Sequence, residues 1–378
     1  MTHDSITEPI HITKVINEGM GLGHLNNRSV LVPKTLPGDI VECSSFRKRK
    51  RLLYGKLKTI LTPSPLRITA PCSHAPECGG CHYIDVDYSD QLKIKQDILM
   101  DTLHYFQPSF VEKCEDIVPC KSTRYHRNKM EFSFTIEDDR YHLGLKKQGS
   151  FSEVVPITDC LLLAKESNKI LSFTESFFDR NPLPIWDSRE QTGCLRHLMI
   201  RHSKAFDHFM VNILASYPDD CFQHYAKELM NTFSSVKSVN HICIEEKKGS
   251  PTQTTCIHLR GDTVIQEKIN DCIFSISPLS FFQTNSLQVG TLYDTVKQCA
   301  PIKENSTVLD LYCGTGTIGI YITQNRCNLI GIEEIEDAIS NAKENAKLNN
   351  ITEATFICGR VKNILKFQTF NPDIVIID

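Results

Sequence analysis

The sequence predicts a multidomain α/β protein that begins with a small β-barrel, continues as an α+β region and ends in a doubly wound α/β domain. Two changes of pattern indicate this division. Short β-type segments separated by turns fill residues 8–60, whereas strands and helices alternate from about residue 305. At 378 residues the chain exceeds one ordinary hydrophobic core. We expect three domains, over residues 1–62, 63–270 and 271–378.

The first sixty residues alternate short β-type segments with turns, as a small barrel does. Glycine-rich and proline-containing turns at residues 19–23 and 37–38 separate the expected strands. These strands are residues 11–15, 29–32, 39–42 and 54–57. The pattern favours a barrel of the oligonucleotide-binding kind, with residues 62–65 as the linker that closes it.

The charge of this first region is basic. Residues 1–60 hold ten Lys and Arg against five Asp and Glu, a net charge of +5 (10 − 5). Half of the ten basic residues belong to the uninterrupted run at residues 47–51. Such a run is usually a solvated turn, although in a compact basic module it can contact a phosphate backbone. No apolar run approaches the ~20 residues that span a bilayer, and the start lacks the features of a secretory signal, so we expect a cytoplasmic protein without membrane contact.

Three cysteines follow the barrel in the pattern Cys72-x5-Cys78-x2-Cys81. Two glycines between the last two cysteines permit a tight turn, and a fourth ligand has to come from elsewhere, for which Cys160 is the candidate. Four thiolates hold either a tetrahedral zinc ion or an iron–sulfur cluster. Zinc sites usually show two Cys-x2-Cys pairs and this chain has one, which favours the cluster. Unliganded buried cysteines are the remaining alternative.

The central region is expected to combine helices and strands. A helix should begin near Ser89 as its N-cap, with an apolar stripe that includes Leu99 and Phe106. Residues 118–265 are mostly β-type, interrupted by a helical segment near residues 161–179. The clearest of these strands are residues 130–134 and 198–201.

The last region predicts a parallel sheet covered by helices. Its expected strands are apolar on both faces, which is typical of a doubly wound sheet. They are residues 308–312, 329–332, 354–357 and 373–377, with helices from residue 318 and through residues 338–346.

The turn after the first of these strands has the form Asp-x-x-x-Gly-x-Gly, with Gly314 and Gly316 as its glycines. Glycines in such a turn let the backbone approach a ligand closely. Glu333 stands at the end of the next strand, where a carboxylate can accept hydrogen bonds from ribose hydroxyls. The spacing resembles the S-adenosylmethionine version of this turn more than the dinucleotide fingerprint. The alternative is a glycine-rich turn without a ligand.

Together these residues resemble the RNA uracil-5-methyltransferase family over nearly the whole chain. Residues 8–60 look like the family's TRAM domain, a β-barrel that binds RNA, and the four cysteines are similar to its [4Fe-4S] ligand set. Residues 125–129 resemble its Tyr-Arg-Asn-Lys element with one residue inserted, and residues 280–285 match its Phe-x-Gln-x-Asn element. The third domain should therefore be a Rossmann-like class I methyltransferase domain.

The resemblance implies a set of positions that bind S-adenosylmethionine. The family often has asparagine where this chain has Thr317, and a hydroxyl replaces only part of an amide's hydrogen bonding. Arg360 stands where a smaller polar residue is common, so no cofactor role is expected for it. The implied cofactor-binding residues are Gln283, Tyr312, Gly314, Gly316, Thr317, Glu333 and Asp378.

The family's catalytic residues are expected beyond Asp378. In the family a cysteine thiolate adds to C6 of uracil, C5 then takes the methyl group, and a base removes the C5 proton. The sequence stops at Asp378, before the segments that bear this cysteine and base, so we expect a truncated sequence or a frameshifted gene that is inactive as it stands. Cys313 lies where the methionine part of the cofactor should bind, so it is not expected to act as a substitute nucleophile.

The expected function is methyl transfer from S-adenosylmethionine to C5 of a uridine in RNA. The barrel and the cluster favour 23S ribosomal RNA, and hence rRNA processing, over transfer RNA. Three alternatives stay open: a tRNA uridine-5-methyltransferase, an inert remnant that binds RNA and cofactor, and an iron–sulfur redox protein. We expect the protein to be a monomer.

Overall fold

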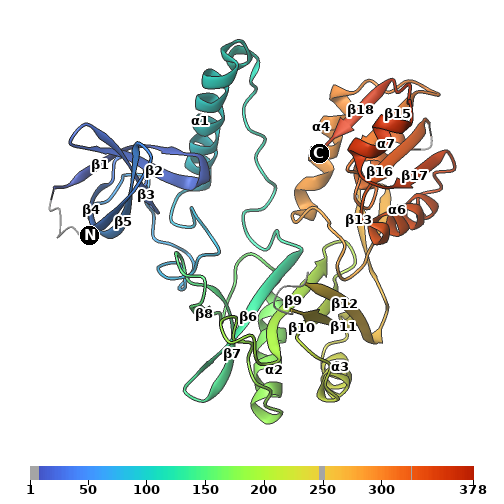
Figure 1. The fold of residues 1–378 in the computed structure, drawn as a ribbon, viewed down its shortest axis with the longest axis horizontal. Helices are drawn as coiled ribbons and strands as arrows, with labels where there is room; N and C mark the ends of the chain where they lie inside the picture. Colours follow the sequence, from blue (N-terminus) through green and yellow to red (C-terminus); the bar gives the residue numbers. More distant parts are fainter. Residues whose placement is uncertain (1–7, 247–251, 325) are drawn as a thin grey trace. The chain divides into compact units, whose positions relative to one another are not determined.

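The computed structural model describes residues 8–246, 252–324 and 326–378, which divide into two compact units (Figure 1). The first unit comprises the described residues up to Pro119 together with Lys146–Glu153, and the second comprises Cys120–Leu145 and Val154–Asp378. No helix in these described ranges is long and apolar enough to cross a membrane.

The first unit is built around a closed five-stranded barrel with the strand order β1-β2-β3-β5-β4, which confirms the predicted N-terminal barrel. Neighbouring strands are antiparallel, except that β3 and β5 are parallel. Buried apolar side chains such as Ile10, Val30 and Val41 fill the barrel. Its strands are β1 (Ile10–Ile16), β2 (Met20–Leu25), β3 (Arg28–Pro33), β4 (Ile40–Arg49) and β5 (Leu52–Thr62).

One predicted turn of the barrel is wrong, because β2 occupies most of residues 19–23. The turn is confined to the short 3-10 segment η1 (Asn17–Gly19), in which Glu18 and Gly19 have φ values of 66° and 68°. A Cβ at Gly21 would lie 1.9 Å from Thr35 Oγ1. Gly19 therefore serves the turn, whereas Gly21 permits close packing inside the barrel.

The basic run at residues 47–51 lies at the tip of the β4–β5 hairpin. β4 continues to Arg49, so only Lys50, with a φ of 56°, and Arg51 form the turn. All five basic side chains are exposed. The run is thus the charged end of a long hairpin, most of it strand, and the prediction of a turn holds for its last two residues only.

Helix α1 (Tyr88–Phe106) follows the barrel, and the short 3-10 segment η2 (Pro108–Lys113) follows α1. The N-cap of α1 is Asp87 and not Ser89, because the Asp87 carboxylate accepts a hydrogen bond from the Ser89 amide at 3.0 Å. Leu99 and Phe106 of the expected stripe are exposed, whereas Ile94 is the buried residue of this helix.

The second unit begins with a seven-stranded sheet in the order β12-β11-β10-β9-β6-β7-β8, which confirms the predicted central α+β region. Buried aromatic side chains of its helices, Phe177, Phe178, Phe222 and Tyr225, form one cluster with ring contacts. The strands and helices are β6 (Lys129–Glu137), β7 (Arg140–Lys146), β8 (Val154–Pro156), α2 (Lys165–Arg180), β9 (Leu195–Ser203), β10 (His208–Ala215), α3 (Cys221–Thr232), β11 (Val236–Glu245) and β12 (Gln253–Gly261).

A four-stranded parallel sheet in the order β17-β16-β15-β18 ends the chain, with every predicted strand and helix of this region present. Separate apolar clusters lie on its two faces, one with α5 and α6 and one with α7, as a doubly wound sheet requires. The elements are α4 (Ser286–Cys299), β15 (Thr307–Leu311), α5 (Thr317–Thr323), β16 (Asn328–Glu333), α6 (Glu336–Leu348), β17 (Ala354–Cys358), α7 (Val361–Phe367) and β18 (Ile374–Ile377).

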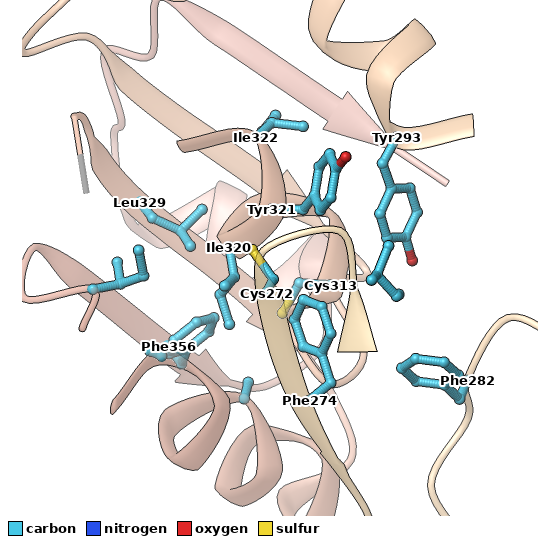
Figure 2. Close-up of a cluster of buried hydrophobic side chains, with 14 of the residues drawn as sticks. Cys272, Phe274, Phe282, Tyr293, Cys313, Ile320, Tyr321, Ile322, Leu329 and Phe356 are labelled. Atoms are coloured by element: carbon cyan, nitrogen blue, oxygen red, sulfur yellow. The ribbon is translucent and has the colours of Figure 1, made fainter. Parts of the chain in front are cut away.

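An antiparallel hairpin, β13 (Ile265–Ile269) with β14 (Cys272–Ile276), packs into the larger of these clusters. Figure 2 shows Cys272 and Phe274 of the hairpin together with Tyr293 of α4 and Tyr321 of α5. The domain boundary expected near residue 270 falls in the turn of this hairpin.

Candidate cofactor pocket and cysteine segment

A cavity of about 920 Å³ opens at the carboxyl ends of β15 and β16, where ligands bind in doubly wound sheets. It is lined by the glycine-rich turn, the start of α6 and residues 277–281 before α4. Gly316 is not among the lining residues. The cavity brings together the other six predicted cofactor residues: Gln283, Tyr312, Gly314, Thr317, Glu333 and Asp378.

The glycine-rich turn needs left-handed backbone at three positions. Tyr312, Gly314 and Gly316 have φ values of 61°, 54° and 76°. A Cβ at Gly314 would meet no atom within 4 Å, because this residue faces the cavity. A Cβ at Gly316 would instead lie 3.1 Å from a ring carbon of Phe356 in the core. Gly316 is therefore explained by backbone conformation and core packing, and Gly314 is the glycine that leaves the cavity open.

Backbone amides hold the Glu333 carboxylate in place. One oxygen accepts from the amides of Glu334 and Ile335 at 2.8 and 3.0 Å, and the other accepts from the amide of Gly314 at 3.2 Å. These bonds fix the carboxylate at the end of β16 and join it to the turn after β15. Carboxylate oxygens retain lone pairs for further donors, so this group can still accept hydrogen bonds from a ligand in the cavity.

The segment before α4 forms a wall of the cavity and is held by Asn128, which directly precedes β6, and by Arg201 of β9. The Asn128 side chain donates to the Gln283 carbonyl at 2.7 Å and to Ser286 Oγ at 2.8 Å. The guanidinium of Arg201, on β9, donates to the carbonyls of Pro278, at 3.1 Å, and Ser280. We call residues 277–286 the wall segment. Its position depends on residues more than seventy positions away in the sequence.

Gln283 and Asp378 come together at the mouth of this cavity. The Gln283 amide donates to the Asp378 carboxylate at 3.4 Å. The side chains thus meet across 95 positions of sequence. This contact joins the wall segment to the end of β18.

Buried polar groups lie beneath the turn. Burial raises the pKa of Asp310 to about 7, and the nearby Asp378 carboxylate adds to the rise, while a 3.1 Å hydrogen bond from the Gly319 amide opposes it. Burial also raises the pKa of Tyr293 to about 12, and its hydroxyl lies 2.9 Å from Thr317 Oγ1. The floor of the cavity is therefore polar, and Asp310 changes its charge close to neutral pH.

Cys313 lines the cavity as a buried thiol. Burial raises its pKa, and the carboxylates of Asp310 and Glu333 raise it further. A thiol must lose its proton to act as a nucleophile. A thiol with a raised pKa is a poor nucleophile near neutral pH, and the role of Cys313 stays a prediction.

Several lining residues escaped the sequence analysis. Asp310 was visible as the acidic residue of the turn motif, but only the fold reveals that it is buried beneath the cavity. Asn341 of α6 also lines the cavity and donates to Ser277 Oγ at 2.9 Å, a contact that no spacing pattern signals. Phe281 is 67% exposed beside the cavity.

Three of the four predicted cluster ligands lie on one segment of the first unit, and Cys160 belongs to the second unit. The Gly80 amide donates to the Cys78 thiol at 3.3 Å. Gly79 approaches the Lys146 carbonyl so closely that a Cβ would lie 2.8 Å from it. Cys160 is buried, with Sγ 3.9 Å from the sulfur of Met130. In the described residues no group of three or more His, Cys, Asp or Glu side chains is arranged to hold a metal ion.

Comparison with known proteins gives consistent matches along the chain. A methyltransferase-domain family matches residues 302–378, and the TRAM domain of tRNA (uracil(54)-C(5))-methyltransferases matches residues 10–66. An uncharacterised RNA methyltransferase of Caldanaerobacter subterraneus subsp. tengcongensis is 32% identical over 98% of this chain and 83% of its own length. Another, from Nanoarchaeum equitans, is 33% identical over 93% of this chain and 75% of its own length.

A solved structure has the same fold over almost the whole chain. The crystal structure of Pyrococcus abyssi tRNA (uracil-54, C5)-methyltransferase, in complex with S-adenosyl-L-homocysteine, gives a TM-score of 0.76 at 24% identity. The match covers 97% of this chain and 82% of that chain. The barrel, the methyltransferase domain and the full-length relatives agree with the resemblance found in the sequence. The protein is a SAM-dependent RNA methyltransferase and belongs to the RNA uracil-5-methyltransferase family.

Proposed function

We propose that this protein transfers the methyl group of S-adenosylmethionine to C5 of a uridine in RNA. The observation that carries the proposal is the cavity that gathers Gln283, Glu333 and Asp378 around the glycine-rich turn. The positively charged sulfonium of the bound cofactor supplies the methyl group. The chain's own residues bind and orient the two reactants.

Each side of the cavity suits one part of this task. Glu333, held by three backbone amides, accepts hydrogen bonds from the ribose hydroxyls of the cofactor. Gly314 leaves room beside the turn for the methionine part. Gln283 and the exposed ring of Phe281 lie on the wall segment, where an uncharged amide and an aromatic face suit a nucleobase.

The RNA class is part of the proposal. The basic barrel supports a nucleic-acid substrate, because its exposed hairpin tip carries five positive side chains. From the sequence, 23S ribosomal RNA is the expected substrate and transfer RNA the alternative. The barrel's match to a TRAM domain named for transfer RNA methylation supports transfer RNA instead.

Tritium release tests the reaction and the RNA class together. Transcripts of transfer RNA and of 23S ribosomal RNA, each labelled with tritium at uridine C5, are incubated with the full-length gene product and cofactor. Replacement of the C5 hydrogen by a methyl group releases tritium to water. We expect cofactor-dependent release from one RNA class. Methyl transfer to RNA without tritium release would contradict C5 as the acceptor, and no transfer to either RNA would contradict the proposed activity.

We also propose that Cys72, Cys78, Cys81 and Cys160 hold a [4Fe-4S] cluster. The chemistry of the donors fits: four thiols, one of which already accepts a backbone amide hydrogen bond, as the sulfurs of protein-bound clusters commonly do. A zinc ion is the alternative, because thiolates bind both.

Metal analysis after anaerobic purification separates these possibilities. We expect about four iron atoms per chain and a visible absorption band. Both should disappear in Cys81→Ser and persist in the control Cys299→Ser, whose thiol is exposed on α4. Zinc in place of iron would support the alternative. Neither metal in the wild-type protein would contradict both.

A further inference from the structure

Two cationic side chains lie opposite each other on neighbouring strands of the central sheet. Lys129 of β6 and Arg201 of β9 are direct partners in the antiparallel register. Side chains of directly opposed residues lie on the same face of the sheet, about 5 Å apart at Cβ. Like charges at such a pair repel each other. Both side chains are also withdrawn from water, since Lys129 is half-buried and Arg201 is only 3% exposed.

No carboxylate neutralises this pair among the residues that the structure describes. The guanidinium of Arg201 donates to the backbone carbonyls of Pro278 and Ser280, which satisfy its hydrogen bonds but leave its charge in place. Glu131, two residues along β6, lies on this face, and its carboxylate lies 3.8 Å from His197 Nε2. Burial lowers the pKa of Lys129, and the charges of Arg201 and Arg127 lower it further, with Glu131 opposing. The pair therefore lacks an anion.

The position of Lys129 and Arg201 indicates that the cofactor does not supply the anion that this pair lacks. Arg201 and Asn128, the residue before Lys129, both hold the wall segment. Lys129 and Arg201 themselves are not among the residues that line the cavity. A cofactor inside the cavity is thus separated from the pair by the wall segment. A ligand that meets Lys129 therefore has to approach from outside the cavity.

We propose that Lys129, reinforced by the charge of Arg201, binds a phosphodiester group of the RNA beside the nucleotide that enters the cavity. The inference rests on the proposed function and names a contact that function requires. Lys129 is the residue that meets the phosphate, because it is partly accessible and Arg201 is not. A phosphate at this point supplies the missing negative charge and fixes the register of the RNA on the protein.

RNA affinity measured as a function of salt tests this contact. Fluorescence anisotropy with unmodified transfer RNA and 23S rRNA transcripts compares the wild-type protein with Lys129→Gln and Lys129→Arg. The control is Lys204→Gln, another half-buried lysine, which lies in the turn after β9 and whose charge is faced by Glu267 and Asp207. S-adenosylhomocysteine affinity and melting temperature are measured for every variant.

We expect Lys129→Gln to weaken RNA binding by about 3–10-fold at low salt and to reduce the salt slope by about one. Lys129→Arg should keep both the RNA affinity and the salt slope at the wild-type level, and so should Lys204→Gln. Cofactor affinity should stay at the wild-type level in Lys129→Gln, and its melting temperature should be equal or higher, because the substitution removes a repulsion.

Other outcomes would overturn the inference. If RNA affinity and salt slope are unchanged in Lys129→Gln while the wild-type protein releases tritium from uridine, the phosphate contact is wrong and the proposed function stands. A parallel loss of cofactor affinity would assign the anion to the carboxylate of the cofactor. An equal loss of RNA affinity in Lys204→Gln would mean that the loss reflects the protein's total positive charge and not a contact made by Lys129. A wild-type protein that binds neither RNA would overturn both proposals.

Discussion

The two sides of the cofactor cavity are built in different ways. The glycine-rich turn is set by residues within about ten positions of one another: β15 ends, three residues take left-handed backbone, and α5 begins. The wall segment is irregular, and two residues distant in sequence hold it: Asn128, just before β6, and Arg201 of β9. The turn should therefore form wherever its own strand and helix form, whereas the wall segment should fail whenever the central sheet is disturbed nearby.

The largest effect is expected from forcing apart α5, the helix that follows the turn, and the parallel sheet. A Cβ at Gly319 would lie 2.6 Å from Leu329 and 2.8 Å from the Asp310 carboxylate, so Gly319→Val forces α5 away from the sheet. We expect a loss on the order of 3 kcal/mol in the free energy of unfolding of this domain. Chemical denaturation monitored by circular dichroism measures it.

Gly314→Ala is the matched comparison for that variant. A Cβ there meets nothing, so its cost is limited to the positive φ, about 1–2 kcal/mol. If Gly319→Val were as stable as Gly314→Ala, the turn would not be packed against the sheet as described.

Releasing the wall segment should cost cofactor binding more than stability of the parallel sheet. Arg201→Met removes the donors to the Pro278 and Ser280 carbonyls and leaves a side chain of similar length. We expect S-adenosylhomocysteine to bind about tenfold more weakly, since about 1.4 kcal/mol of ordering is lost. Isothermal titration calorimetry measures this affinity.

Arg196→Met separates positioning from a general loss of a buried arginine. Arg196 lies on the same strand and is 7% exposed. Its guanidinium pairs with the Glu246 carboxylate at a distance of 2.7 Å, and neither residue lines the cavity. It should lose stability but keep cofactor affinity. Equal affinities in the two variants would contradict a positioning role for Arg201.

The same contrast explains what could be predicted from the sequence. The strands, helices and glycines of residues 305–378 were predictable because hydrophobic period and turn chemistry act over short stretches of chain. Two contacts could not be predicted: the one between Gln283 and Asp378, and the hydrogen bonds from Arg201 to the wall segment. They join segments that only the tertiary fold brings together. Resemblance, not spacing, suggested Gln283 as a site residue. In the barrel, β2 was mistaken for a turn because Gly21 and Gly23 look like turn residues while they serve packing.

The buried Asp310 should make the stability of the turn depend on pH. Its pKa in the folded protein is raised to about 7, above that of an unfolded aspartate, so its contribution to stability is fully present below about pH 4 and is lost as the pH rises through 7. In Asp310→Asn this dependence should be absent, because the amide oxygen still accepts from Gly319 and carries no charge.

Melting temperatures at several pH values between 5 and 8 check this prediction. The wild-type protein should lose more stability than Asp310→Asn across that range, with a difference of roughly 2 °C or more in melting temperature. Parallel curves for the two proteins would mean that Asp310 keeps an ordinary pKa.

The central claim is that the turn and the wall segment form one cavity for S-adenosylmethionine, with Glu333 as its ribose acceptor. Titration of S-adenosylhomocysteine into Glu333→Ala and Glu334→Ala tests it most directly. The neighbouring Glu334 is exposed and paired with Arg360 at 3.2 Å, so its loss should leave affinity within about twofold of the wild type. Loss of Glu333 should weaken binding about 10–100-fold, because charge-assisted hydrogen bonds are removed. Wild-type affinity in Glu333→Ala would contradict the account.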